Sequence, residues 1–256
     1  MKIGIVGTGT VGSVLAKKLA DAEQEVKVTN TKPMSELKKI AADLGAHAAS
    51  LQDLVNDVDV IIFSMPYSAY KGLPKDLLHE VPEGVVVIDT SNYYPMRDGE
   101  IPELKEMTES DYIASILNRP IVKMFNNILQ YAIKNKGKAA GANGRIAIAV
   151  AGDNDQHKKI ASQIANIVGF DTVDNGTLAE SWRQQPGTPA YCTHLNVSEL
   201  KEALSFAIRE KSAAARDRLN EQLVIQKIDF TKEYERVVAL NREIFYQSVG
   251  KEYKAH

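Results

Sequence analysis

The chain has 256 residues, of which 44% are apolar and 25% are charged, values ordinary for a soluble globular protein with one large domain or one large and one small. Its 31 basic and 33 acidic residues give a formal net charge of −2, which argues against nucleic acid as a partner. One cysteine excludes an internal disulfide, and five histidines without metal-ligand spacing predict no metal site.

The longest apolar run, "VIIFSM" at residues 60–65, is too short to span a bilayer. The first residues lack the charged segment and long apolar run of a secretory signal. We therefore expect a cytoplasmic protein without a membrane partner.

Short apolar runs alternate with helical patterns over the first 176 residues. Strands are expected at 2–6, 25–30, 58–66, 83–92, 120–126, 145–152 and 170–176, and helices at 11–22, 34–45, 50–57 and 155–168. Parallel strands need such crossovers, and strands that are apolar throughout are buried on both faces. The pattern predicts an α/β fold with a doubly wound (Rossmann), mostly parallel sheet.

The pattern changes after Gly176. Apolar residues recur on one face between Asn196 and Gln226, which predicts a single long helix, and a second helical pattern covers 234–245. We therefore divide the chain into a dinucleotide-binding domain, residues 1–176, and a C-terminal helical region, residues 177–256. Either the sheet domain or a second subunit must cover the apolar stripe, and we favour a homodimer.

The segment "GTGTVG" follows the first strand and opens the first helix. It matches the dinucleotide-binding pattern G-x-G-x-x-G, in which the glycines permit a tight turn, close approach of a pyrophosphate and close packing of helix on strand. The helix N-terminus then presents free N–H groups to the phosphates. The predicted contacts are Gly7, Thr8, Gly9, Thr10, Val11 and Gly12.

The second strand ends in "VTNTKP", without the Asp or Glu that usually binds the ribose hydroxyls of NAD. A carboxylate there would repel the additional phosphate of NADP, whereas an amide, a hydroxyl and a cation would bind it. Asn30, Thr31 and Lys32 supply these three groups. The strand end therefore predicts NADP(H) rather than NAD(H).

Three later strand ends carry polar and rigid side chains where the nicotinamide half of the cofactor would lie. The predicted contacts are Ser64, Met65, Pro66, Tyr67, Thr90, Ser91, Asn92 and Asn126. Tyr93 and Tyr94 fit ordinary packing equally well. A strand-end Asp such as Asp89 is more often a structural hydrogen-bond acceptor, so we assign it no catalytic role.

No nucleophile–base arrangement is readable in the sequence. Tyr67 and Lys71 have the Tyr-x-x-x-Lys spacing, but a loop containing Gly72 and Pro74 follows them. This lack favours direct hydride exchange with little proton transfer, for which the protein mainly supplies orientation. The catalytic residues stay unassigned, with Asn126 as the candidate nearest the nicotinamide.

These blocks together resemble the family of F420-dependent NADP oxidoreductases, whose Rossmann domain is also similar to the oxidoreductase domain of the STEAP metalloreductases. The resemblance covers roughly residues 1–193. It is carried by "KIGIVGTGTVGSVLAKKLA", "VTNTKP", "VIIFSMPYSAY", "VVVIDTSNYYPMRDG", "IVKMFNNI", "IAIAVAGDNDQHKKIA" and "FDTVDNGTLAESWRQQPGTPAYCT".

The resemblance implies that NADPH binds along residues 7–12, 30–32 and 64–67, and that a second redox partner lies near Asn126. The segment after Gly176 would help to form its pocket, with Glu180, Trp182, Arg183 and Gln184 as candidate contacts. Trp182 could equally anchor the helical region to the sheet. The predicted activity is hydride transfer between NADP(H) and a planar acceptor, with coenzyme F420 as first candidate. A free flavin, a flavin-bound ferric chelate or a quinone is the alternative acceptor, and a redox sensor without turnover is the alternative of another class.

Overall fold

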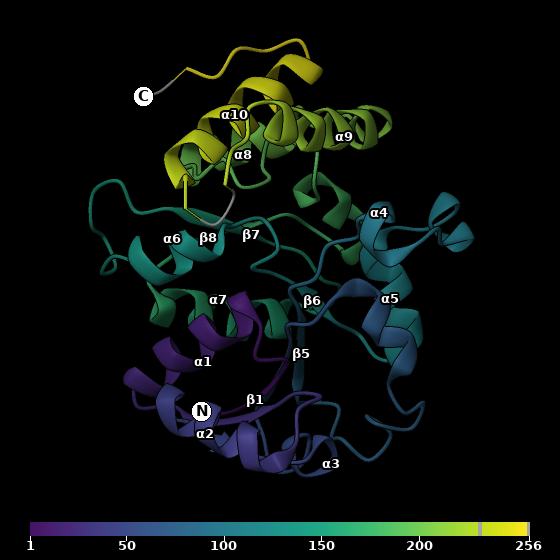
Figure 1. The fold of residues 1–256 in the computed structure, drawn as a ribbon, viewed down its shortest axis with the longest axis vertical. Helices are drawn as coiled ribbons and strands as arrows, with labels where there is room; N and C mark the ends of the chain where they lie inside the picture. Colours follow the sequence, from purple (N-terminus) through teal and green to yellow (C-terminus); the bar gives the residue numbers. More distant parts are fainter. Residues whose placement is uncertain (230–231, 255–256) are drawn as a thin grey trace.

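The computed structural model describes residues 1–229 and 232–254. A six-stranded parallel sheet in the order β3-β2-β1-β4-β5-β6 forms its centre, which confirms the predicted doubly wound α/β fold (Figure 1). Its strands are β1 (Lys2–Val6), β2 (Glu25–Thr29), β3 (His47–Ala48), β4 (Val60–Phe63), β5 (Val86–Asp89) and β6 (Val122–Lys123). The short edge strand β3 has no counterpart in the sequence prediction.

A second, two-stranded parallel sheet contains β7 (Ala147–Val150) and β8 (Asp171–Asp174). An antiparallel bridge between Lys123 and Ala151 joins it to the end of β6. The predicted strands at 145–152 and 170–176 therefore exist, but they pair with each other and do not extend the parallel sheet. The reason is that β7 meets β6 in the antiparallel direction and only at this single point.

The helices are α1 (Thr10–Asp21), α2 (Met34–Leu44), α3 (Leu51–Leu54), α4 (Pro95–Asp98), α5 (Glu109–Leu117), α6 (Gln130–Asn135), α7 (Asp155–Val168), α8 (Val197–Ser205), α9 (Arg209–Ile225) and α10 (Tyr234–Ser248). The described residues also contain three 3₁₀ segments, η1 (Tyr67–Gly72), η2 (Pro102–Lys105) and η3 (Leu178–Gln184). Local chemistry sets several boundaries. The Asn154 side chain accepts hydrogen bonds from the first turn of α7, and Gly169 ends that helix in the left-handed conformation.

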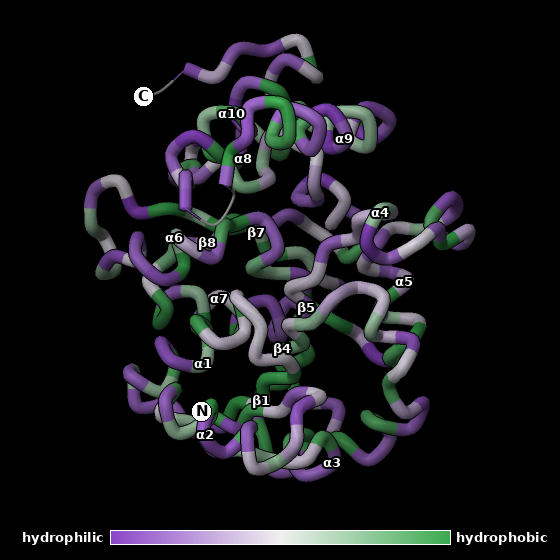
Figure 2. Tube along the Cα trace, viewed as in Figure 1, coloured by the Kyte–Doolittle hydropathy of each residue, from purple (hydrophilic) through white to green (hydrophobic). Residues whose placement is uncertain are grey.

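Alternate residues of each strand enter the cores on the two faces of the sheet. On β4, Val60 and Ile62 pack with α1, α2 and α7, whereas Ile61 and Phe63 pack with α3, η1 and α5. This period of two follows from the pleat of a strand. Figure 2 shows that segments such as β1 and β7 are hydrophobic, whereas the segments at the periphery of the view are more hydrophilic.

The C-terminal helices α8, α9 and α10 gather at one end of the molecule, beyond β7 and β8 (Figure 1). They correct the prediction of one long helix over 196–226, since the chain bends between α8 and α9, where Ile208 is extended. The two halves pack on different cores. Leu200 and Leu204 of α8 lie against β7 and β8, whereas Ala215 and Leu219 of α9 join the main core. A straight helix could not reach both.

The predicted strand at 120–126 is also shorter than expected. Only Val122 and Lys123 pair as β6, because Phe125 has a φ of 62°, in the left-handed region that a bulky side chain rarely adopts. Among the described residues, no helix combines the length and the apolar character needed to cross a bilayer. The division of the chain at Gly176 stays a prediction.

Candidate active site

The glycine turn lies between β1 and α1, and its three glycines serve different purposes. Gly7 has a φ of 105°, and a Cβ on it would lie 2.2 Å from the carbonyl oxygen of Ser64. A Cβ on Gly12 would lie 2.0 Å from the Gly7 carbonyl oxygen. These two positions need glycine because the turn itself is tight.

Gly9 differs, because nothing in the protein requires glycine there. Its φ of −74° suits any residue, and a Cβ would meet no atom of residues 1–229 and 232–254 within 4 Å. It caps α1, which has no side-chain cap and no acidic residue in its first turn. An open space before a helix N-terminus suits an anion, so the residues present fit the pyrophosphate of a dinucleotide.

The end of β2 is tied to this turn through Asn30. Its Nδ2 donates to Thr8 Oγ1 at 2.6 Å, and its Oδ1 accepts from the backbone N–H of Lys32 at 2.8 Å. Asn30 therefore holds the two predicted segments together and has only one amide hydrogen left for a ligand. The Lys32 ammonium is exposed and lies 3.3 Å from the carboxylate of Glu36, one helical turn further along.

The segment after β4 contributes less open surface than the sequence predicts. Ser64 and Met65 are half-buried and Pro66 is exposed, but Tyr67 is 1% exposed. The Tyr67 ring packs on Tyr93 and Tyr112, with ring centroids 5.4 and 6.0 Å away. Its hydroxyl donates to the backbone oxygen of Glu109 at 2.8 Å. Tyr67 is thus a buried packing residue that stabilises the loop after β4.

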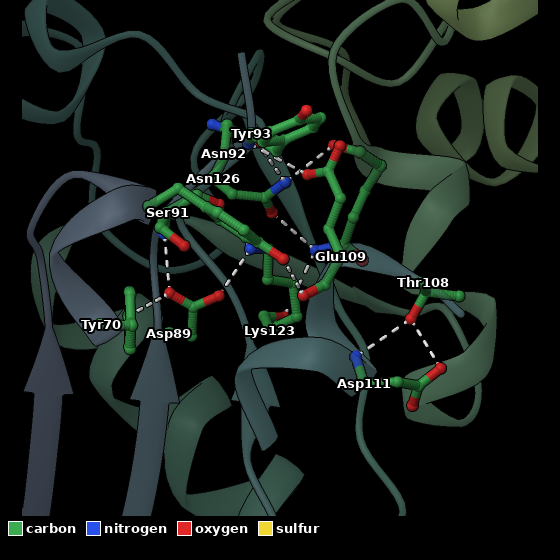
Figure 3. A network of polar contacts seen from close by, with 12 residues as sticks. Tyr70, Asp89, Ser91, Asn92, Tyr93, Thr108, Glu109, Asp111, Lys123 and Asn126 are labelled. Carbon is green, nitrogen blue, oxygen red and sulfur yellow. Dashed lines mark hydrogen bonds and ion pairs between the residues drawn. The ribbon is translucent and has the colours of Figure 1, made fainter. Parts of the chain in front are cut away.

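A buried ion pair lies where β5 and β6 end (Figure 3). Lys123 Nζ is 2.6 Å from Asp89 Oδ2, and both side chains are almost completely buried. Asp89 Oδ1 accepts from the Tyr70 hydroxyl at 2.5 Å and from the Ser91 backbone N–H at 2.9 Å. Lys123 also donates to the backbone oxygen of Ser91. Every charge here is compensated, so Asp89 acts as the structural acceptor that its position suggests.

Asn126 is 2% exposed and fully engaged by its neighbours. Its Nδ2 donates to Asn92 Oδ1 at 3.1 Å and to the Gln184 backbone oxygen at 2.9 Å. Its Oδ1 accepts from Gln184 Nε2 at 2.8 Å, and its backbone oxygen accepts from Asn92 Nδ2 at 2.9 Å. No amide hydrogen of Asn126 is left for a cofactor, so this side chain holds the loops after β5 and β6 together.

The segment that was predicted to line the acceptor pocket divides into two. Gln184 is completely buried and belongs to the Asn126 cluster. Glu180 and Arg183 pair with each other at 2.6 Å, and the Arg183 guanidinium lies 4.5 Å from the centre of the Trp182 ring. Arg183 also donates to the backbone oxygen of Leu204, which directs it to α8. This contact favours an anchoring role for Trp182 and Arg183.

Glu109 lies among these residues, although the sequence analysis does not single it out. It is the first residue of α5, which Thr108 caps by accepting from the Asp111 N–H. The Glu109 carboxylate accepts from the Tyr93 N–H at 3.2 Å. Burial raises the pKa of this carboxyl to about 7, against the opposing effect of Lys123. The pattern Thr-x-x-Asp could have predicted the helix, but not the neighbours of its first residue.

Aromatic hydroxyls complete the surroundings of the site. The Tyr94 and Tyr191 hydroxyls lie 2.8 Å apart, and the Tyr93 hydroxyl donates to the Gly99 backbone oxygen at 2.8 Å. Both Tyr93 and Tyr94 therefore have partners within the protein. No group of three or more His, Cys, Asp or Glu side chains in 1–229 and 232–254 is arranged to hold a metal ion.

Comparison with known proteins places this geometry in a family. Residues 2–93, which contain the glycine turn and the ends of β2, β4 and β5, match the family described as NADP oxidoreductase coenzyme F420-dependent. The Escherichia coli protein YjhV is 37% identical over 105 residues, 41% of this chain and 74% of YjhV. The chain belongs to this family. It is accordingly an NAD(P)-dependent oxidoreductase with a nicotinamide cofactor.

One further relative is similar in sequence, and two solved structures are similar in fold. Rat metalloreductase STEAP3 is 27% identical over 187 residues, which are 70% of this chain but only 35% of STEAP3. A Sinorhizobium meliloti protein of 23% identity has a TM-score of 0.64 and covers 77% of this chain and 95% of its own. An Arthrobacter protein named as an F420-dependent NADP reductase has 22% identity and a TM-score of 0.56, covering 71% of this chain and 87% of its own.

Proposed function

We propose that this family member transfers hydride between NADP(H) and a planar redox acceptor, with coenzyme F420 as the first candidate. The observation that carries the cofactor half is Gly9, whose glycine identity neither the turn nor its packing requires. A bound pyrophosphate explains it, because only glycine leaves that approach to the α1 N-terminus open. The nicotinamide supplies a hydride when it is bound.

The end of β2 supports NADP(H) over NAD(H). Asn30 fixes the position of the Lys32 backbone next to the glycine turn. Thr31 and Lys32 are exposed, and the sequence from Val28 to Lys32 contains no carboxylate that would repel a phosphate. Glu36 neutralises part of the Lys32 charge at 3.3 Å, but exposed pairs of this kind are weak and a phosphate dianion competes effectively.

The nicotinamide end is assigned to the carboxyl ends of β4, β5 and β6. Here the protein's own contribution is rigidity. Asn126, Asn92 and Gln184 fix the loops against each other, and the Asp89–Lys123 pair fixes the strand ends below them. Such a frame can hold two planar rings in contact, which is the main requirement of direct hydride transfer.

The family description supports F420 as the acceptor. A flavin that passes electrons to ferric iron is the second candidate, since the similarity to the metalloreductase STEAP3 extends over 187 residues, well beyond the 2–93 segment. The chain spans only 35% of STEAP3, so the activity of that whole protein is carried over as a proposal. A quinone is a third acceptor to test.

Residues 177–256 form the proposed acceptor-side and subunit-contact region. We expect a cytoplasmic homodimer, and light scattering of the purified protein tests the number of subunits. A mass of one chain, 28.2 kDa, would contradict it.

Loss of NADPH absorbance with purified protein tests the function, with F420, FMN alone, FMN with ferric chelate, and a quinone as separate acceptors. We expect fast turnover with F420. Turnover with another acceptor only would replace F420 and keep the oxidoreductase reading. Tight NADPH binding without turnover on any acceptor would instead identify a redox sensor.

A further inference from the structure

We propose that Glu109 is the catalytic proton donor and acceptor of this site, exchanging a proton with a ring nitrogen of the acceptor as hydride moves to or from another atom of the same ring. This inference rests on the proposed function and adds the proton-transfer group that the sequence analysis does not supply.

Glu109 lies at the nicotinamide end of the proposed site. Glu109 is joined to both loops that we assign to the nicotinamide end. The hydroxyl of Tyr67, which follows β4, donates to its backbone oxygen at 2.8 Å, and the N–H of Tyr93, which follows β5, donates to its carboxylate at 3.2 Å. Figure 3 shows Glu109 on the same side of the strand ends as Asn92, Tyr93 and Asn126.

The carboxyl groups of Asp89 and Glu109 differ in how many of their oxygens already have partners. Asp89 has both oxygens occupied by Tyr70, Ser91 and Lys123 and is completely buried. Glu109 uses Oε2 for the Tyr93 N–H, and within 1–229 and 232–254 its Oε1 accepts no hydrogen bond and it forms no ion pair. Glu109 is thus the carboxyl group of this cluster with an oxygen to spare for a ligand.

The charged surroundings come from several elements. Lys123 of β6 and Arg216 of α9 favour the carboxylate of Glu109, as does the Tyr93 N–H, whereas Asp89 of β5 and burial favour the acid. Tyr67 and Tyr94 also face it, and burial keeps the pKa of both hydroxyls above the ordinary value. On η3, which packs on α5, Glu180 and Arg183 pair with each other. The net effect raises the Glu109 pKa to about 7, where a carboxyl can both give and take a proton.

The hydride of NADPH forms a C–H bond with a deazaflavin ring, or an N–H bond with a flavin ring, and the electron pair of the ring double bond moves to a further ring nitrogen. The O–H bond of protonated Glu109 breaks as an N–H bond forms at that nitrogen. NADPH is oxidised, the acceptor is reduced, and Glu109 remains as a carboxylate that solvent protonates again. The reverse direction uses the carboxylate as base.

The experiment measures the pH profile of acceptor reduction for wild type, Glu109→Gln, Glu109→Asp and the control Glu106→Gln, an exposed glutamate just before α5. Since the acid form is the donor, wild-type turnover should fall about tenfold per pH unit above about pH 7. Glu109→Gln should lower kcat about 100-fold at pH 6 and abolish the inflection, since general acid catalysis contributes 10²–10⁴-fold. Glu109→Asp should retain an inflection and part of the rate, and Glu106→Gln should match wild type.

NADPH affinity separates catalysis from folding. Gln can accept the Tyr93 N–H as Glu does, so the NADPH Kd of Glu109→Gln should stay within about twofold of wild type. Wild-type kcat and an unchanged inflection in Glu109→Gln would overturn the proton role and leave the proposed function intact. If Glu109→Gln fails to bind NADPH, Glu109→Asp decides, and an Asp variant without any inflection would overturn the inference. Wild-type protein without turnover on F420, FMN, FMN with ferric chelate or the quinone would overturn the proposed function and this inference with it.

Discussion

Two regions at the carboxyl edge of the sheet are built in different ways, the nucleotide end at β1 and the other end at β5 and β6. At the turn between β1 and α1, the space above Gly9 is open and the α1 N-terminus has no side-chain cap. At the ends of β5 and β6, polar side chains bind each other: Asn126 has no amide hydrogen left for a ligand, and both carboxylate oxygens of Asp89 already have partners. The turn at β1 can therefore bind the negative charge of a ligand. The ends of β5 and β6 form a rigid frame against which the rings of the cofactor and the acceptor can lie.

The difference teaches that a polar side chain at a strand end is not by itself a ligand contact. Asn30 and Asn126 are both amides at such positions. Most of the hydrogen bonds of both side chains connect one segment of the protein with another. What distinguishes the nucleotide end is unused space and unused N–H groups. Substitutions at the two ends should therefore fail in opposite ways, through binding at the first and through stability at the second.

The largest effect is expected from Gly9→Val. The added side chain would occupy the approach to the helix N-terminus, and loss of charge-assisted hydrogen bonds to phosphate should weaken NADPH about 100-fold or more. The melting temperature should stay unchanged, because a Cβ at this position meets no atom within 4 Å. Calorimetric titration and thermal unfolding measure the two quantities. The contrasting variant Gly12→Ala should lower the melting temperature, since its Cβ would lie 2.0 Å from the Gly7 oxygen.

Asn126→Ala should break the frame at the other end. It removes the partner of Asn92 and Gln184 in a buried cluster and should reduce the free energy of unfolding by about 2 kcal/mol. NADPH affinity should change less than threefold. Urea denaturation and NADPH titration test both points, and a large loss of affinity with unchanged stability would mean that Asn126 contacts the cofactor after all.

Lys32→Glu should weaken NADPH binding about tenfold and leave NADH binding nearly unaffected. The reason is that we place the Lys32 charge beside the additional phosphate, which only NADPH carries. At high salt, the loss of NADPH affinity caused by Lys32→Glu should come closer to the loss of NADH affinity, because salt screens an exposed charge. Equal losses for NADPH and NADH at low salt would contradict our account of the β2 end.

Glu36→Gln should have the smallest effect, and it complements Lys32→Glu because Glu36 is the ion-pair partner of Lys32. It releases Lys32 from its 3.3 Å pair, so NADPH affinity should rise about twofold, within the range of an exposed ion pair. NADH affinity should not move. A fall in NADPH affinity would show that Glu36 holds Lys32 in its binding position.

Sequence patterns anticipated the parts of the fold that depend on neighbours along the chain. The helix at 155–168 is present with the predicted bounds, and the helix predicted over 34–45 ends at Leu44, with Gly45 in the left-handed conformation after it. The helix expected over 50–57 is real but short, from Leu51 to Leu54, with Ser50 as its cap. These features were readable because capping residues and periodicity act within a few residues.

Long-range packing decided the rest. The apolar stripe from Val197 to Leu223 is continuous in sequence, yet its two halves serve different cores and the helix breaks between them. Glu109 is 16 residues from Tyr93, and the capping pattern beside it predicts a helix but not this contact. Only folding places its carboxyl beside the loops of β4 and β5.

By itself, the sequence determined the doubly wound sheet, the glycine turn and the family, because each depends on local periodicity or on a short motif with a fixed geometry. The tertiary structure alone decided which polar groups remain free. That outcome depends on partners far apart in the chain: Asn126 with Gln184, Asp89 with Lys123, and Tyr67 with Glu109. A hydrogen bond made inside the protein is unavailable to a ligand, and no single segment of sequence records where that bond will form.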